Sequence, residues 1–204
     1  MAAGWAAAAE EAARPRFKPA AVSGERDLAQ DGAEVLPPPS HKPREGRFGA
    51  TFGTTVHRAI GLVLRDPGMT PTAAVGRAAQ GTGLAEHLAE AVEDVARALT
   101  SLRAEGLLRS LGSDLQVEYP VAGATPGGLL LSGYVDLVSV TSTRVDVIDF
   151  KTDAPPQGPA EETYSDYAAQ VRAYGRLLGL SDCATGRQLR TGLLFSADGS
   201  IHWV

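Results

Sequence analysis

Apolar residues recur at helical spacing just after residue 50, and the spacing changes to strand-like alternation beyond residue 114. The helical part divides into separate segments because proline and glycine interrupt it. The longest of these segments has an apolar stripe of leucine, valine and alanine along one face. The helices that this pattern predicts are 54–65, 71–81 and 83–105.

Residues of the usual capping types lie at the ends of these helices. Thr54 or Thr55 can cap the first helix through a side-chain oxygen. Thr70 followed by Pro71 is typical of a cap and a first-turn proline, and they would begin the second helix. Gly106 lies where the end of the third helix is expected.

The second half of the chain alternates short apolar runs with one further helical pattern. Such a sequence of helices, meander, helix and strands predicts an α/β (or α+β) fold. In this fold a mixed central sheet is flanked by helices and preceded by an N-terminal helical region. The predicted strands are 114–121, 129–140, 144–151, 188–196 and 200–204, and the predicted helix is 162–179.

The N-terminal part differs in composition from the rest. Residues 1–14 are alanine-rich and predict a helical tail, whereas 15–50 are rich in proline, glycine and charge. We therefore divide the chain into a partly disordered tail and linker, 1–47, and a folded domain, 48–204. The start lacks a secretory signal and no apolar run is long enough for a membrane span. With Cys183 as the single cysteine, we expect an intracellular, cytoplasmic protein.

Two acids and a lysine lie in the central strands. Asp149 and Lys151 are two residues apart, so their side chains leave a strand on the same face. A hairpin through 140–144 would bring Asp136 alongside them. Two carboxylates and an amine can hold a divalent metal ion and activate a water molecule beside a phosphate. A structural ion pair, Asp149 with Lys151 or Asp136 with Arg144, explains the same residues equally well.

Four more residues extend this set in a fixed order along the chain. His57 lies in the first helix, Glu118 ends a strand, and Gln170 and Tyr174 are four apart on one helical face. Each alone is typical of ordinary packing or of a surface position. Together with the acids and the lysine they give the order His, Glu, GxxD, DxK and QxxxY.

This order resembles the RecB/AddA-type nuclease domain of the PD-(D/E)xK superfamily, over about residues 48–204. The resemblance implies a restriction-endonuclease-like core for the predicted α/β fold. The most specific part is the run Ile148-Asp149-Phe150-Lys151-Thr152. The other matching pieces are Gly53-Thr54-Thr55-Val56-His57-Arg58, Glu118, Gly133-Tyr134-Val135-Asp136 and Gln170-Val171-Arg172-Ala173-Tyr174.

The resemblance implies a metal site with catalytic residues around it. The implied metal ligands are His57, Asp136, Asp149 and the backbone carbonyl of Phe150. The implied catalytic residues are Lys151, which would orient or deprotonate the attacking water, Glu118, which would support the metal shell, and Gln170 and Tyr174, which would position the DNA and the lysine. Oxygen ligands with one imidazole suit Mg²⁺ or Mn²⁺. The single cysteine excludes the four-cysteine iron–sulfur cluster of some relatives, and the chain has no Walker-type ATP site.

The implied activity is hydrolysis of DNA, preferably single strands, with a helicase domain or subunit in recombinational repair near the nucleoid. A net charge of −5 is unusual for a DNA-binding protein. Two explanations are open: metal ions neutralise the acids while a partner supplies most of the DNA contact, and the isolated domain binds DNA weakly. We favour both together. The alternatives are a catalytically silent nuclease fold used for DNA binding or assembly, and an RNA-directed or restriction-type nuclease.

Overall fold

The structure is a computed structural model that describes residues 18–21, 46–108, 114–124 and 129–204. The predicted helical tail and most of the predicted linker lie outside these residues. The elements in chain order are β1 (Lys18–Ala21), η1 (Gly46–Phe48), α2 (Ala50–Arg65), α3 (Pro71–Thr82), α4 (Leu88–Ala104), β2 (Leu115–Ala124), β3 (Leu129–Val140), β4 (Arg144–Lys151), α5 (Ala160–Thr163), α6 (Ser165–Gly179), η2 (Asp182–Ala184), β5 (Gln188–Phe195) and β6 (Ser200–Trp203).

Six described strands form one mixed sheet in the order β1-β3-β4-β5-β6, with β2 on the other edge of β3. Strands β2, β3 and β4 are an antiparallel meander, as the alternating pattern predicts. Strand β5 runs parallel to β4, and the chain between them contains α6. Strand β6 then pairs antiparallel with β5. The predicted mixed sheet flanked by helices is confirmed.

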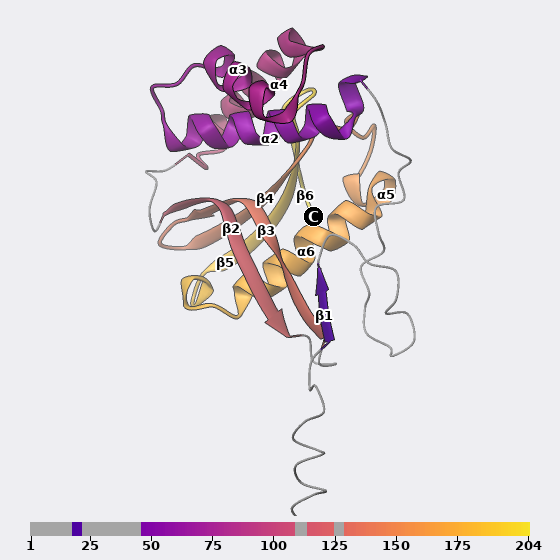
Figure 1. The fold of residues 1–204 in the computed structure, drawn as a ribbon. Helices are drawn as coiled ribbons and strands as arrows, with labels where there is room; N and C mark the ends of the chain where they lie inside the picture. The colour runs from indigo at the N-terminus through magenta and orange to yellow at the C-terminus, as the bar shows by residue number, and fades with distance from the viewer. Residues whose placement is uncertain (1–17, 22–45, 109–113, 125–128) are drawn as a thin grey trace, which may run out of the picture.

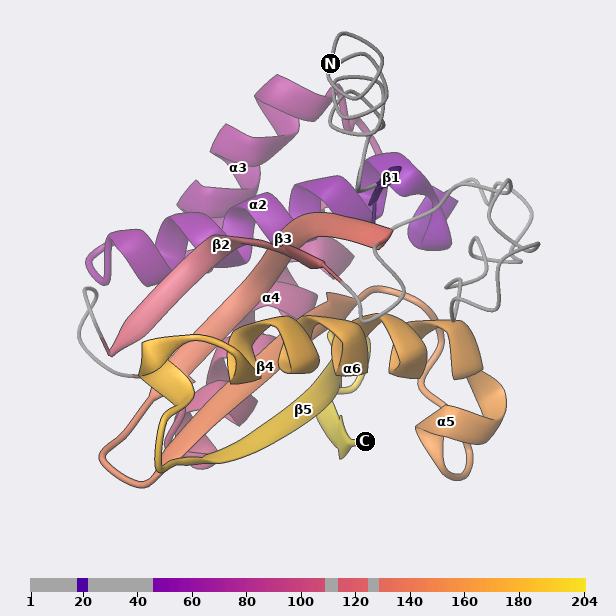
Figure 2. The same cartoon turned by 90° about the horizontal axis from the view of Figure 1, so that it is seen from below.

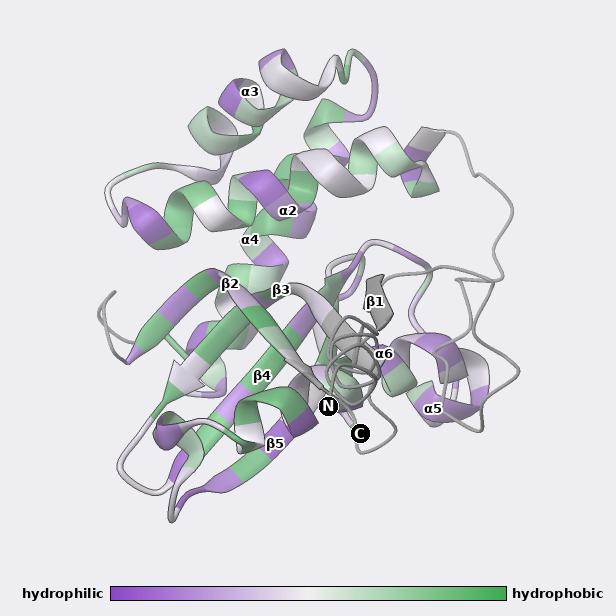
Figure 3. Cartoon of the chain, turned by 60° about the horizontal axis from the view of Figure 1, so that its bottom comes forward, coloured by the Kyte–Doolittle hydropathy of each residue, from purple (hydrophilic) through white to green (hydrophobic). Residues whose placement is uncertain are grey.

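Helices cover both faces of the sheet and create two separate cores. Helices α2, α3 and α4 form one layer above the sheet, and α6 crosses its other face (Figures 1 and 2). The first core joins the three helices to residues such as Leu137, Ile148 and Phe150. The second joins α6 to residues such as Val147 and Leu193. Hydrophobic positions of β4 alternate with charged ones (Figure 3), and its residues are buried except for the two at its ends.

The helix boundaries agree with the sequence pattern at some ends and differ at others. Thr70 accepts from the Ala73 N–H at 3.2 Å, so the predicted cap of α3 is confirmed. The predicted threonine cap of α2 is wrong, because this helix begins at Ala50 after Gly49. Thr55 instead donates to the Thr51 carbonyl at 2.8 Å within the helix.

Two breaks in the helices were not predicted. Helix α4 begins at Leu88, after His87 adopts a left-handed backbone with φ of 60°. The helix expected at 162–179 is two helices, α5 and α6, because Tyr164 has φ of −130° between them. Its hydroxyl donates to the Ala154 carbonyl at 2.6 Å, which fixes this corner of the chain.

Candidate active site

The two candidate acids lie where the pairing between β3 and β4 stops. The antiparallel ladder ends at the pair Leu137 and Ile148. One residue further, the same register places Asp136 opposite Asp149. Here the acceptor is a side chain and no longer a backbone carbonyl, since the Phe150 N–H donates to Asp136 Oδ2 at 2.7 Å. The two acids therefore occupy neighbouring positions at the point where the strands separate.

The regular alternation of β3 breaks at Asp136. Leu137 packs in the core beneath α2, α3 and α4, whereas Val135, two residues earlier, packs in the core beside α6. Two residues of a regular strand would face the same side. On β2, the register of its neighbours places Glu118 opposite Asp136, and Glu118 has a left-handed φ of 53°. Both strands are thus distorted at one level, which turns Asp136 toward the helical layer.

The GxxD motif is the part of β3 that lacks a strand partner along one edge, among the described residues. Strand β2 pairs along one edge of β3. On the other edge, β1 pairs with residues 129–132 and β4 pairs with residues 137–140. Residues 133–136 have no strand partner on that second edge among the described residues. Tyr174 of α6 packs here, because a Cβ on Gly133 would lie 2.8 Å from its Cε1 atom. The glycine of the motif therefore makes room for the tyrosine of QxxxY.

His57 reaches the acids from α2. Its Nδ1 atom lies 3.4 Å from Asp136 Oδ1, and its ring meets Phe150 edge-on with centroids 5.8 Å apart. The helix comes this close to the end of β4 at Gly53, where a Cβ would lie 3.0 Å from Thr152 Oγ1. The glycine one helical turn before the histidine thus permits the approach that positions it.

Lys151 lies at the centre of the remaining contacts. Its ammonium is 2.6 Å from Asp149 Oδ2 and donates to Gln170 Oε1 at 3.3 Å. Gln170 in turn donates to the Tyr174 hydroxyl at 3.3 Å. The ammonium also lies 3.9 Å from the centroid of the Tyr167 ring. The lysine is therefore held on several sides and its position is largely fixed.

Burial and charge act in opposite directions on the ionisable groups. Burial would lower the pKa of His57, but the nearby Asp136 carboxylate outweighs it and the pKa is raised. Burial would raise the pKa of Asp136, yet His57 and the Phe150 N–H hold it below its usual range. For Asp149 burial dominates and Asp136 adds to it, so the pKa is raised despite Lys151. A further cation beside Asp149 would therefore be stabilising.

The side chains present fit a divalent cation in kind and in location. Asp149 Oδ2 is buried and lies 2.6 Å from the Lys151 ammonium, and no other group among the described residues donates a hydrogen bond to it. Carboxylate oxygens with one imidazole suit Mg²⁺ or Mn²⁺. Within the described ranges, no group of three or more His, Cys, Asp or Glu side chains is arranged as a formed metal site. The candidate ligands thus lie in two pairs, His57 with Asp136, and Asp149 with the catalytic candidate Lys151.

Most of the residues predicted from the sequence converge, and one points elsewhere. His57, Asp136, Asp149, Lys151, Gln170 and Tyr174 are linked by the contacts above, and Phe150 bonds to Asp136 through its N–H. Glu118 instead pairs with Arg65 at 2.7 Å on the exposed side of β2. Its support of a metal shell stays a prediction.

Sequence reasoning missed Tyr167 as a neighbour of the lysine. Its position three residues before Gln170 on one helical face could have indicated it. One ion pair considered from the sequence is wrong. Arg144 was a candidate partner for Asp136 and pairs instead with Asp146 at 2.8 Å. Asp146 is completely buried.

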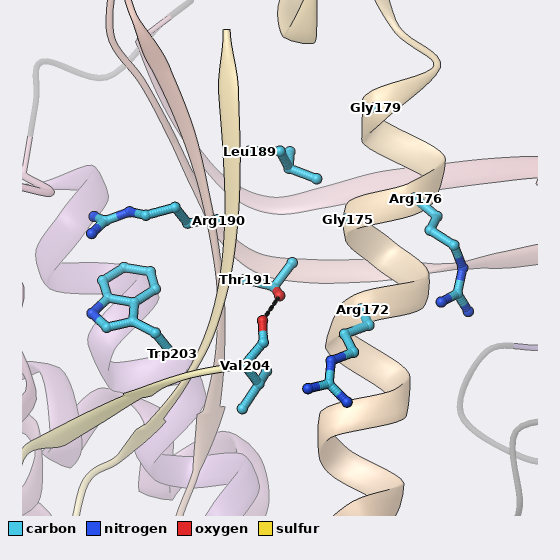
Figure 4. A pocket seen from close by; sticks show the side chains of 9 residues that line it. All are labelled: Arg172, Gly175, Arg176, Gly179, Leu189, Arg190, Thr191, Trp203 and Val204. Atoms are coloured by element: carbon cyan, nitrogen blue, oxygen red, sulfur yellow. Dashed lines mark hydrogen bonds between the residues drawn. The ribbon is translucent and has the colours of Figure 1, made fainter. Parts of the chain in front are cut away.

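A cavity of about 560 Å³ lies apart from this cluster, between α6 and the first half of β5. Figure 4 shows Leu189 and Thr191 pointing toward α6, with Arg190 and Trp203 on the other side of the strand. Arg190 stacks on Trp203 at 3.8 Å and pairs with Asp146 at 2.6 Å. Arg172 pairs with Glu161. Because these arginines already have partners, we do not place the active site here.

Comparison with known families gives a match over most of the chain. The family described as the PD-(D/E)XK nuclease superfamily matches residues 29–197, which include every residue of the cluster. A search of curated proteins finds no match to the chain. Among the described residues, no helix has the length and apolar character needed to cross a membrane.

Proposed function

The chain belongs to the PD-(D/E)XK nuclease superfamily, and we propose that it is a divalent-metal-dependent deoxyribonuclease whose active site is the cluster around Asp136 and Asp149. Members of this superfamily are generally nucleases that use Mg²⁺ or a similar ion, and a nuclease fold implies DNA binding. We further propose single-stranded DNA as the preferred substrate and a helicase as the partner, on the basis of the RecB/AddA-like order of motifs.

The observation that carries this proposal is the convergence of distant residues at one break in the sheet. His57, Asp136 and Lys151 come from three different elements, yet the chain of contacts from His57 to Tyr174 is continuous. A structural ion pair would need only Asp149 and Lys151. It would not explain a histidine aimed at Asp136 or glycines that make room for helices on both sides.

His57, Asp136, Asp149 and the Phe150 carbonyl would hold the metal ion. When bound, such an ion lowers the pKa of a coordinated water and neutralises charge on the phosphate. Lys151 would orient the attacking water and offset negative charge that develops on the phosphate oxygens. Gln170 holds the lysine, and burial raises the pKa of Tyr174, so its hydroxyl keeps its proton and stays available as a donor.

The direct test is cleavage of labelled single-stranded DNA by the purified chain with Mn²⁺. The proposal predicts cleavage that EDTA abolishes and that Asp149→Asn and Lys151→Ala reduce by at least about 100-fold, the range of a single transition-state contact. The control is Gln188→Ala, at the exposed first residue of β5, and this variant should cleave as wild type. Absence of cleavage with any divalent ion, even with a helicase partner added, would contradict the proposal.

The close Asp149–Lys151 pair also favours one alternative, a silent nuclease fold that binds DNA without cutting it. This alternative predicts DNA binding by the wild type and no metal-dependent product. Parallel DNA and RNA substrates would separate the proposed deoxyribonuclease from an RNA-directed enzyme with the same chemistry.

A further inference from the structure

A second pocket lies on α2 beyond the histidine, and its lining is rich in arginine. The pocket has a volume of about 300 Å³ and lies between α2, α3 and β2. It is lined by Arg58, Leu62, Arg65, Arg77, Ala78, Gly81 and Glu118. Three guanidinium groups therefore share this small space with one carboxylate.

The charges in this pocket are not balanced. Glu118 pairs with Arg65 at 2.7 Å. Among the described residues, neither Arg58 nor Arg77 has an acidic partner, and both are exposed. Arg58 extends toward α3 over Gly81, where a Cβ would lie 3.4 Å from its Nη1 atom. Within the part of the chain that the structure describes, two arginines without an acidic partner thus converge on one pocket, in a chain of net charge −5.

The pocket adjoins the proposed active site. Arg58 follows His57 directly in α2, and Arg65 is eight residues from the histidine, about 12 Å along the helix at 1.5 Å per residue. Glu118 lies opposite Asp136 in the β2–β3 register. Helix α2 therefore presents the candidate metal ligand and two of the three arginines, and α3 adds Arg77.

We propose that this arginine pocket binds backbone phosphates of the DNA strand that flank the phosphate being cut. Guanidinium groups bind phosphate oxygens with two parallel hydrogen bonds, which suits a groove for a phosphodiester chain. The pocket supplies the local positive charge that the overall composition lacks. The inference rests on the proposed nuclease function. It adds the path of the DNA strand over the protein, from the metal site along α2 toward α3.

Glu118 has a specific place in this arrangement. Its carboxylate neutralises Arg65 and competes with an incoming phosphate for the same guanidinium. The distorted backbone at Glu118 holds this side chain at the pocket. Removal of the Glu118 charge should therefore tighten DNA binding, whereas a role in holding metal would make the same change weaken it.

The test is binding of a fluorescent single-stranded oligonucleotide, measured by anisotropy across salt concentrations with Mn²⁺ present. All variants carry Lys151→Ala so that the DNA stays intact. Arg58→Gln with Arg77→Gln should weaken binding and reduce the slope of log Kd against log salt by about 0.7 for each phosphate that the protein no longer neutralises. Arg58→Lys with Arg77→Lys should recover much of the slope, and Glu118→Gln should tighten binding.

The control is Arg103→Gln, which removes one positive charge, half of that removed in the double variant, from an exposed position on α4 outside the pocket. The phosphate assignment is wrong if the double variant keeps the salt slope of the Lys151→Ala protein, or if Glu118→Gln weakens binding. Cleavage by the wild type would leave the nuclease proposal standing in either case. If the wild type neither cleaves nor binds single-stranded DNA, both proposals fall. Thermal melting of each variant distinguishes weaker DNA binding by a folded protein from unfolding.

Discussion

The contact between Gly133 and Tyr174 permits a quantitative test of how the site is built. A Cβ added at Gly133 would lie 2.8 Å from Cε1 and 3.0 Å from the hydroxyl oxygen of Tyr174. Tyr174 is only 3% exposed and cannot swing out without cost. Gly133→Ala therefore forces overpacking, which costs about 1–3 kcal/mol of the free energy of unfolding.

Urea denaturation followed by circular dichroism measures this cost. With a slope of about 2 kcal/mol per molar urea, the midpoint should fall by about 0.5–1.5 M. Gly76→Ala is the matched control. Nothing lies within 4 Å of its Cβ position in α3, so alanine should stabilise the helix by about 0.5–1 kcal/mol.

A double-mutant cycle identifies the cause. All three atoms nearest to the Gly133 Cβ position belong to Tyr174, so Gly133→Ala should cost close to nothing in a Tyr174→Ala background. A cost that persists in this background would refute the reasoning. In the wild-type background the substitution should also lower cleavage, because Tyr174 supports Gln170 and through it Lys151.

Three further predictions concern stability and metal binding. Asp146→Asn should lower the free energy of unfolding by about 3 kcal/mol, since it leaves two arginines beside a buried site that lacks a charge; scanning calorimetry should show a melting temperature about 6–12 °C lower. Thr70→Ala should cost about 0.5–2 kcal/mol through loss of the α3 cap, and Thr70→Ser should recover most of it in urea denaturation. Mn²⁺ at 100 times its dissociation constant should stabilise the wild type by about 2.7 kcal/mol in thermal shift, and His57→Ala or Asp136→Asn should remove this gain; equal stabilisation of all three proteins would place the ion elsewhere.

The sequence pattern predicted most of the sheet because its local signals agree. The bounds predicted for β3 and β4 match those of the structure, since alternation, β-branched residues and a short polar turn all favour the same hairpin. The cap at Thr70 was predicted from equally local sequence signals. Strand spacing and the hairpin also predicted that Asp136 lies near Asp149 and Lys151. The approach of His57, Gln170 and Tyr174 was predicted only from the order of the motifs, because spacing along the chain cannot show that α2 reaches the end of β4.

The parts that were not predicted depend on contacts between distant segments. Asp146 alternates with apolar residues as an exposed residue would, yet Arg190 from β5 comes close enough to stabilise it in a buried position. The distortion at Glu118 and Asp136 reverses the facing of side chains in a way that regular alternation cannot anticipate. The arginine pocket brings together α2, α3 and β2, and no local signal marks Arg77 as a neighbour of Arg58.

The most direct test of the nuclease site is a crystal structure of the chain soaked in Mn²⁺, with the ion located from its anomalous scattering. The account predicts a peak in contact with His57 and with carboxylate oxygens of both Asp136 and Asp149, close to the Lys151 ammonium. A manganese peak bound by other residues, in a protein that cleaves DNA under the same conditions, would contradict it.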